Sequence, residues 1–501
     1  MEAHAERRFN LVDENWIPVA GEGTVSLKRV FTDLRLKALG GNPVEKIALT
    51  KLLLAIAQAA YTPKDDEEWA RLGATGMAGK AVRYLEEKKD LFWLYSDRPF
   101  LQIPAIEKAQ KRSCGTGFYP DAPAENNTIL FQCQIDQGLS DPQRAVFLVT
   151  LMGFALGGKR IGEPIILSNG YSGKTITAKA GPNLGYAGYL HSYLVGNNFL
   201  ESLFLNLYTL EKIESISYFP SGIGEAPWER MPEGENCETA IKLKNSYMGC
   251  IVPLCRFILF TKDGMHYSEG IQYPNHIAGW REPSIAFNEQ NKKVKMLWVD
   301  PQKSPWRELT SLLSFISATS QSEKSFECRQ IQDNLLRSRK AGVCRFGIWS
   351  GGLRVTSNSG DQSVKKNDDY MESEVFFKPE WFAEGTWFTN LKAEMEKLEE
   401  IAKVIYGAAI GYFKQQKADG KNQAAMTANL FWQLSERKFQ ELVNACGDGT
   451  GKEAMSMRHL FIDYANKAYN TFCPRETARQ IEAWAANRPN LTRILPREQN
   501  G

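Results

Sequence analysis

The stretch LKAEMEKLEEIAKVIYGAAIGY (residues 391–412) decides what fold we expect for the C-terminal part of the chain. Its apolar residues recur four and three positions apart in alternation, which places them on one face of a long α-helix. These residues are Leu391, Met395, Leu398, Ala402, Ile405, Ala409 and Tyr412. Because such a helix gains most of its stability by packing its apolar face against other elements, we expect a bundle of helices here.

Three further helical stretches follow, near residues 424–446, 452–472 and 474–487. They are separated by the turn residues of 447–449 (GDG) and by Cys473-Pro474, where proline cannot continue a helix. Four helices in succession, joined by short connections, predict a four-helix bundle over residues 376–501.

The sequence before residue 376 has a different character. Residues 44–61 (VEKIALTKLLLAIAQAAY) show helical spacing and end before Pro63, but short β-branched and aromatic runs dominate from about residue 91. These runs are LFWLY (91–95), PIIL (164–167), CRFILF (255–260), KVKMLWV (293–299) and CRFGIW (344–349). We therefore predict an α+β protein, with a large mixed α/β domain with long loops over residues 1–375 and the bundle after it. The polar stretch 353–375 is either a hairpin or a connection between the domains.

The overall composition restricts the classes of function. The 61 Lys and Arg residues stand against 58 Asp and Glu residues, so any contact with nucleic acid must be local. The nine cysteines are scattered, which favours a reducing, cytoplasmic setting over a disulfide-bonded secreted protein. We find neither a signal peptide nor an apolar run of membrane-spanning length, and we expect no contact with a membrane.

One loop resembles a phosphate-binding motif. Residues 168–175 (SNGYSGKT) follow a strand-like run and end in Gly-Lys-Thr, but Ser168 stands where that motif requires glycine. The residues after Thr175 are β-branched and soon interrupted by Gly181-Pro182, so they do not predict the helix that should follow. A nucleotide-dependent enzyme using this loop remains an alternative. Our main expectation is a protein without catalytic residues, cofactor or metal site.

Two loops place lysines among small residues. Residues 173–182 hold Lys174 and Lys179 with little side-chain bulk around them, which would let a nucleic-acid backbone approach closely. Lys262 lies in a Lys-Asp-Gly sequence between two strand-like runs, which is typical of a hairpin turn. From the residues alone, both loops could equally be solvated surface turns.

Several short motifs occur in an order that identifies a family. They are NLVDENWIPV (10–19), AYTPKDDEEW (60–69), SDRPFLQ (96–102), ENNTILF (125–131), FTKDGMHYSEGIQYPNH (260–276) and SGGL (350–353). In this order, and with a helical bundle after them, they resemble the large subunit of the type I-E CRISPR Cascade surveillance complex, the CasA family. The resemblance spans nearly the whole chain.

The resemblance implies a non-enzymatic subunit that lies at the 5′ end of the crRNA. Such a subunit reads the motif adjacent to the target in double-stranded DNA, mainly from the minor groove, and starts to open the duplex for pairing with the guide. Its implied partners are the backbone, 5′-handle-binding and small subunits of Cascade, the crRNA, the target DNA and a recruited helicase-nuclease. A generic RNA-binding scaffold is a further alternative.

The resemblance also implies which residues contact DNA and RNA. Lys262 corresponds to the lysine that enters the minor groove, and the glycine-rich loop of the family falls on 177–183, with Lys179, Ala180, Gly181 and Asn183. The hairpin that wedges under the first base pair falls in 355–362, with Asn358, Ser359, Gly360, Asp361 and Gln362; either Gln362 or Asn358 could be the wedge. The loop that docks onto the crRNA handle and neighbouring subunits falls on 126–132, with Asn126, Asn127, Thr128, Leu130 and Phe131. Burial in the core is the alternative for Phe131.

Overall fold

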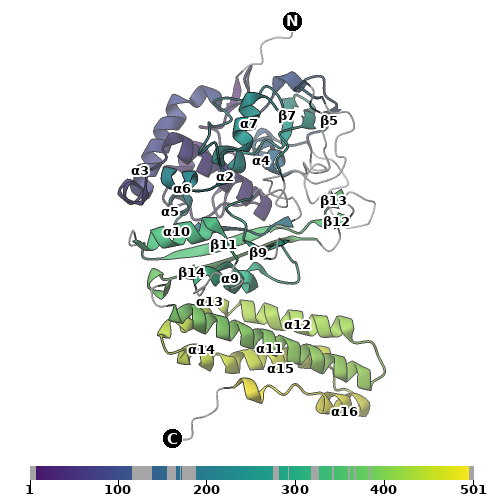
Figure 1. The fold of residues 1–501 in the computed structure, drawn as a ribbon. Helices are drawn as coiled ribbons and strands as arrows, with labels where there is room; N and C mark the ends of the chain where they lie inside the picture. Colours follow the sequence, from purple (N-terminus) through teal and green to yellow (C-terminus); the bar gives the residue numbers. More distant parts are fainter. Residues whose placement is uncertain are drawn as a thin grey trace. The chain divides into compact units, whose positions relative to one another are not determined.

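A computed structural model gives the fold of the chain (Figure 1). It describes residues 7–115, 138–154, 165–169, 171, 188–274, 281–290, 293–316, 326–340, 343–358, 361–365, 368–382 and 385–495. Helices and strands are both well represented in these residues, as the α+β prediction requires. None of the described helices is long and apolar enough to cross a membrane.

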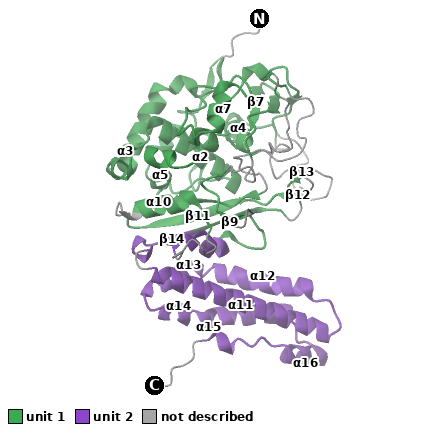
Figure 2. Cartoon of the chain, viewed as in Figure 1, with its two compact units in different colours: residues 1–306, 326–374 green, residues 307–325, 375–501 purple. Residues whose placement is uncertain are grey.

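The chain divides into two compact units (Figure 2). Unit 1 consists of residues 1–306 and 326–374, and unit 2 consists of residues 307–325 and 375–501. Unit 2 thus includes a segment that we assigned to the first domain from the sequence. At the start of that segment, the Arg307 guanidinium lies 3.8 Å from the ring centre of Trp432 and forms a 2.8 Å ion pair with Glu399. These contacts join the segment to helices that are distant in sequence.

Unit 1 is built around helix α2 (Pro43–Ala60). Asn42 caps the helix in a reciprocal capping box with Glu45, and the chain becomes extended at Tyr61, two residues before Pro63, so the helix predicted from residue 44 is confirmed. Most of α2 is buried, and it packs against α3 (Asp66–Glu87), α4 (Asp141–Gly153), α5 (Phe199–Asn206) and α8 (Tyr247–Ile251). The other α-helices described in this unit are α1 (Leu27–Val30), α6 (Leu210–Glu214), α7 (Glu238–Lys244) and α10 (Arg329–Lys340).

Two three-stranded sheets accompany these helices. One has the order β14 (Tyr370–Phe377), β11 (Phe346–Leu353), β6 (His191–Val195), and the other has the order β5 (Lys111–Arg112), β8 (Gly264–Glu269), β7 (Arg256–Thr261). Two-stranded pairs are formed by β1 (Arg8–Asn10) with β4 (Trp93–Tyr95), β2 (Ile17–Val19) with β3 (Gly23–Val25), β9 (Phe287–Gln290) with β10 (Lys293–Met296), and β12 (Thr356–Asn358) with β13 (Asp361–Ser363).

Most of the strand-like runs in the sequence contain strands. Those at 91–95, 255–260, 293–299 and 344–349 contain β4, β7, β10 and β11. The expectation of a strand at 164–167 was wrong, because Ile165 and Leu167 lie in irregular backbone. The amide of Ile165 donates to the Ser268 hydroxyl at 3.2 Å instead of to a neighbouring strand. The backbone amides of this apolar segment therefore find their hydrogen-bond partners in side chains.

Apart from the end of β14, the regular elements that the structure describes in unit 2 are helices. The long helix α11 (Thr386–Gln415) packs against α12 (Lys421–Glu436), α15 (Arg458–Phe472) and α16 (Ala478–Ala486), and all seven residues of the predicted apolar face are buried. Short helices α9 (Leu309–Leu312), α13 (Phe439–Ala445) and α14 (Lys452–Ser456) complete the unit. The helices predicted at 424–446 and 452–472 are thus each divided in two.

Candidate nucleic-acid interface

Lys262 lies at the tip of the hairpin that joins β7 to β8. The two strands pair antiparallel through six residue pairs, from Arg256 with Glu269 to Thr261 with Gly264, so Lys262 and Asp263 form a two-residue turn. The hairpin predicted from Lys-Asp-Gly is therefore confirmed. Both turn residues are exposed.

The base of this hairpin is buried and firmly bonded. Arg256, which is 7% exposed, donates to the Glu269 carboxylate at 3.1 Å and to the Tyr267 hydroxyl at 2.9 Å. Burial raises the pKa of Tyr267, so its hydroxyl stays uncharged beside the guanidinium. Near the tip, Arg144 from α4 donates to the backbone carbonyls of Thr261 at 2.9 Å and Lys262 at 3.3 Å. The backbone that carries Lys262 is thus held from both ends.

The charges around the tip leave the Lys262 ammonium available. The neighbouring carboxylate, Asp263, pairs with Lys111 of β5 at 3.2 Å. Lys262 itself forms no ion pair with any acid that the structure describes. Gly264 allows β5 to approach this closely, because a Cβ atom there would collide with the backbone carbonyl of Arg112. An exposed cation on a fixed backbone is suited to contact an anionic or electron-rich ligand.

The segment in which the resemblance places a wedge also forms a hairpin. Strands β12 and β13 pair through three residue pairs, the last being Asn358 with Asp361. Thr356 donates to the Asp368 carboxylate at 2.7 Å, and that carboxylate accepts from the Lys365 amide at 2.8 Å, which stabilises the base. Gln362 is 3% exposed, so in this conformation its side chain is inside the protein and does not reach a ligand.

Gly188 lies close to the start of the predicted wedge segment. It follows the 177–183 loop in sequence, and with φ of 73° it adopts a left-handed conformation that favours glycine. A Cβ atom at this position would lie 2.9 Å from both the Leu353 carbonyl oxygen and the Val355 amide nitrogen. The backbone at Gly188 therefore lies close to the backbone at the start of the predicted wedge segment.

The remaining predicted contact residues are outside the described part of the chain. They are Lys179, Ala180, Gly181 and Asn183 of the glycine-rich loop, Ser359 and Gly360 of the hairpin tip, and Asn126, Asn127, Thr128, Leu130 and Phe131 of the docking loop. Arg144, in contrast, is a residue that the sequence analysis missed. Its role depends on the approach of α4 to the hairpin, for which the local sequence holds no signal.

The start of the loop that resembles a phosphate-binding motif (residues 168–175) is hydrogen-bonded to the Glu235 carboxylate. The backbone amides of Leu167 and Ser168 donate to Glu235, at 3.1 and 2.9 Å, and the Ser168 hydroxyl accepts from the Asn236 amide at 2.8 Å. Glu235 is fully buried. A nucleotide phosphate would have to approach this buried negative charge, which weighs against nucleotide binding at Ser168.

Unit 1 also contains a buried polar cluster. The Lys51 ammonium lies 2.8 Å from the Glu282 carboxylate, Ser284 donates to the same carboxylate at 3.0 Å, and the Nδ1 atom of His191 lies 2.9 Å from the Ser284 hydroxyl. Burial, together with the charge of Lys51, lowers the pKa of His191 well below its ordinary value. Each of these side chains is at most 4% exposed, so the cluster is enclosed within unit 1. The described residues contain no group of histidine, cysteine and acidic side chains arranged to hold a metal ion.

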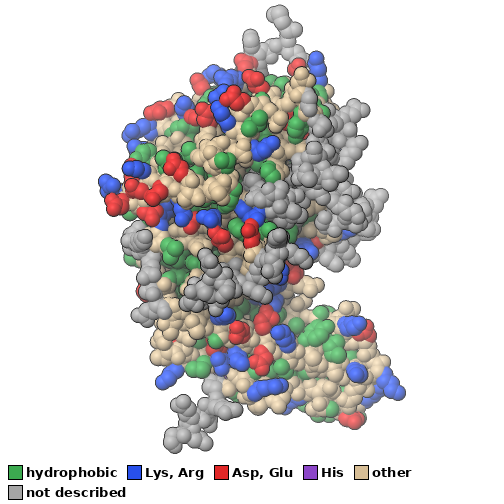
Figure 3. Space-filling view, in the orientation of Figure 1, with side chains coloured by type: hydrophobic (Ala, Val, Ile, Leu, Met, Phe, Trp, Pro, Cys, Tyr) green, Lys and Arg blue, Asp and Glu red, His purple; other side chains and the backbone are tan. Residues whose placement is uncertain are grey.

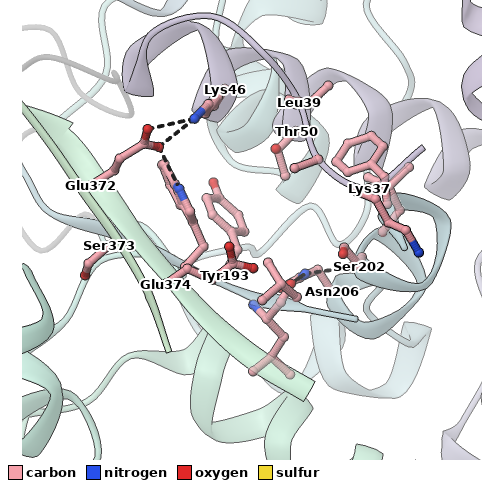
Figure 4. A pocket seen from close by; sticks show the side chains of 16 residues that line it. Lys37, Leu39, Lys46, Thr50, Tyr193, Ser202, Asn206, Glu372, Ser373 and Glu374 are labelled. Atoms are coloured by element: carbon pink, nitrogen blue, oxygen red, sulfur yellow. Dashed lines mark hydrogen bonds and ion pairs between the residues drawn. The ribbon is translucent and has the colours of Figure 1, made fainter. Parts of the chain in front are cut away.

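A cavity of about 320 Å³ lies between α2, α5 and the β14–β11–β6 sheet (Figure 4). Leu39, Phe199 and Leu203 contribute to its apolar lining, and at its rim Glu372 accepts from Lys46 at 2.7 Å and from the Trp349 indole at 2.9 Å. The cavity is large enough to accept an apolar side chain or a small apolar molecule. One buried polar residue of the lining, Asn206, is bonded within the protein and donates to the Leu194 carbonyl at 2.6 Å.

Comparison with known proteins gives a consistent result. Residues 10–480 match the family model of the CRISPR-associated protein Cse1. The CRISPR-associated protein CasA/Cse1 of Thermus thermophilus is 27% identical over 427 residues, which is 79% of this chain and 76% of that protein.

Solved structures show the same fold. The crystal structure of Thermobifida fusca Cse1 aligns with a TM-score of 0.71 at 21% identity, covering 97% of this chain and 95% of that one. The crystal structure of Thermus thermophilus CasA aligns with a TM-score of 0.70 at 20% identity, covering 97% and 99%. A chain of a structure described as a CRISPR RNA-guided surveillance complex aligns with a TM-score of 0.64 at 13% identity, covering 96% and 98%.

Proposed function

Because this chain belongs to the CRISPR-associated protein Cse1 family, we propose that it is the non-catalytic large subunit of a type I-E Cascade surveillance complex. In this role it examines double-stranded DNA for the short motif next to the target and starts to open the duplex for pairing with the crRNA. Sequence beyond the motif is read by the guide, a division of labour known from other RNA-guided effectors.

The observation that carries the proposal is the presentation of Lys262. An exposed ammonium without an ion-pair partner among the described residues stands on a two-residue turn, and buried bonds of Arg256 and backbone bonds of Arg144 fix that turn. A narrow, fixed hairpin can bring a single donor to the floor of the minor groove. The base edges there present acceptors that hardly distinguish A·T from T·A, so we expect a relaxed preference among adjacent motifs.

Opening of the duplex is assigned to the β12–β13 hairpin. Unstacking one base step costs about a few kcal/mol, which the inserted hairpin and the growing RNA–DNA hybrid must offset. Since the Gln362 side chain is buried, Asn358 is the better candidate of the two for the wedge residue.

The proposed partners follow from the same role. The loop at 126–132 would dock onto the crRNA handle and neighbouring subunits, with Asn126 and Asn127 as hydrogen-bonding residues and Phe131 as an apolar anchor. A separate helicase-nuclease would be recruited after opening, because this subunit is proposed to have no catalytic group of its own.

Lys262→Ala in the assembled complex tests the proposal. We expect binding to duplexes with the correct adjacent motif to weaken by about 1–3 kcal/mol, since a contact to base edges is lost. Duplexes with a wrong motif should lose much less. The measurement is a titration of both duplexes at two salt concentrations.

Lys108→Ala is the charge-matched control, because it removes an exposed lysine of unit 1 that lies outside the β7–β8 hairpin. If Lys262 contacted only phosphates, Lys262→Ala would weaken binding to every duplex about equally and would reduce the salt dependence by roughly one counterion. An equal loss across all motifs would refute the assignment of motif reading to Lys262.

A further inference from the structure

Two segments of unit 2 meet at one end of the helical bundle. The Arg479 guanidinium at the start of α16 donates to the Gln416 carbonyl after α11 at 2.8 Å, and the Asn487 amide beyond α16 donates to the Gln415 side chain at 2.8 Å. The Tyr412 hydroxyl donates to the Pro474 carbonyl at 2.5 Å. Residues 414–421 and 475–488 therefore form one surface, which we name the basic end.

The basic end concentrates positive charge. Its six basic residues are Lys414, Lys417, Lys421, Arg475, Arg479 and Arg488, all exposed, and its three acidic residues are Asp419, Glu476 and Glu482. The resulting charge of +3 equals the formal net charge of the whole chain. Figure 3 shows basic side chains at the end of the bundle formed by the α11–α12 turn and α16.

These six cations differ from Lys397 and Lys438 of the same unit, which are paired. Lys397 pairs with Glu400 at 2.9 Å and Lys438 pairs with Glu441 at 2.7 Å. None of the six forms an ion pair with an acid in the described part of unit 2. Placing unpaired cations together raises their mutual repulsion, and a bound anion would relieve it.

An indole ring holds two of the guanidinium groups in place. The Cζ atoms of Arg475 and Arg488 lie 4.9 and 5.3 Å from the ring centre of Trp484. The Trp484 Nε1 atom donates to the Asn470 side chain at 2.9 Å, which fixes the ring. Lys417 is also held, in a left-handed turn with φ of 61° that is closed by a 3.0 Å bond from the Ala418 amide to the Phe413 carbonyl. The charges are thus presented on an ordered surface.

Apolar surface accompanies the charge. Ile481 is 50% exposed, and Trp484, three residues later on the same helical face, is only partly buried. A duplex offers phosphates but keeps its base faces stacked inside, whereas a single strand offers phosphates together with free base faces. The mixture of cations and apolar side chains favours the single strand.

We propose that the basic end of unit 2 binds single-stranded nucleic acid, with the six cations on the phosphates and the exposed Ile481 side chain against a base. This contact is separate from motif reading in unit 1 and does not require that assignment to be correct. With a local charge of +3, it should bind weakly and with a strong dependence on salt.

The test uses the full chain and a 20-nucleotide dT oligonucleotide. We compare the triple variant Lys414→Gln/Lys417→Gln/Lys421→Gln with the charge-matched triple Lys392→Gln/Lys397→Gln/Lys438→Gln from elsewhere in unit 2. The first triple should reduce affinity at low salt by about tenfold or more, and should lower the slope of log K against log salt by roughly 2. The control triple should change both quantities much less.

Three results would overturn the proposal. The first is equal affinity of the two triple variants for the oligonucleotide. The second is an equal loss of affinity for a 20-base-pair duplex, which would indicate a duplex site. The third is equally effective competition by polyglutamate, which would indicate a surface for an acidic protein.

Two further variants check the structural basis. Trp484→Ala should weaken oligonucleotide binding because it releases Arg475 and Arg488, whereas Trp484→Phe should restore most of it. Failure of the phenylalanine variant to restore binding in a normally folded protein would contradict the proposed role of the ring. Lys262→Ala should leave the effect of the lysine triple unchanged, so this proposal and motif reading by Lys262 can fail independently.

Discussion

The interior around Lys51 and the hairpin tip around Lys262 place the same side chain in opposite environments within unit 1. Lys51 is 1% exposed and lies 2.8 Å from Glu282, whereas Lys262 is exposed and has no ion-pair partner among the described acids. A buried ammonium must be compensated, because its hydration is lost. An exposed one keeps its hydration and can exchange it for a ligand. Burial therefore separates lysines that stabilise the fold from lysines that can bind.

Of the changes that test this comparison, Lys51→Met should have the largest effect on the stability of the protein. The substitution leaves the Glu282 carboxylate buried without its cation, which should lower the free energy of unfolding by about 3–5 kcal/mol. Denaturant unfolding measures the change. The double variant Lys51→Met/Glu282→Gln should recover a large part of the loss, since no isolated charge remains. A single variant as stable as the native protein would show that the pair does not need mutual compensation.

A change of pH should have an intermediate effect on stability, through the protonation of His191. Its pKa in the folded state is lowered mainly by burial, so between that value and about 6.5 the unfolded chain binds a proton that the folded chain does not. Stability should therefore be fully present above about pH 6.5 and fall as the pH decreases below it, with a slope of up to about 1.4 kcal/mol per pH unit from this group.

Denaturant unfolding at several pH values between 7 and 5 measures this slope. His191→Gln provides the comparison, because glutamine keeps hydrogen-bonding capacity near Ser284 but cannot titrate. The variant should show a smaller slope, after allowance for its changed stability at pH 7. An identical slope in both proteins would mean that other groups cause the acid sensitivity.

The smallest effect is expected at the rim of the cavity in unit 1, from Glu372→Gln. The Lys46–Glu372 pair has side chains that are 21% and 38% exposed, so water screens the attraction. The free energy of unfolding should fall by less than about 1 kcal/mol. Denaturant unfolding of Glu372→Gln and Lys51→Met under the same conditions compares the two losses directly. A loss as large as that of Lys51→Met would contradict the distinction between buried and exposed pairs.

Much of the architecture could be predicted because its causes are local. The apolar face of residues 391–412 follows from spacing of three and four residues, and all its members are buried in α11. The Lys-Asp-Gly turn at Lys262 is likewise encoded by adjacent residues. The prediction of a strand at 164–167 was wrong because the backbone amides of this segment donate to the side chains of Ser268 and Glu235. Both side chains are distant in sequence.

The sequence by itself determined the helical and mixed regions, the hairpin of Lys262 and the resemblance to the family, since each depends on residue order over short distances. Only the tertiary structure decided which lysine is buried, because Lys51 and Glu282 are 231 residues apart and meet through packing. It also joined residues 307–316 to unit 2 and brought residues 414–421 and 475–488 to one surface. Burial and charge density are properties of the folded surface, and a linear pattern does not specify which distant segments will share it.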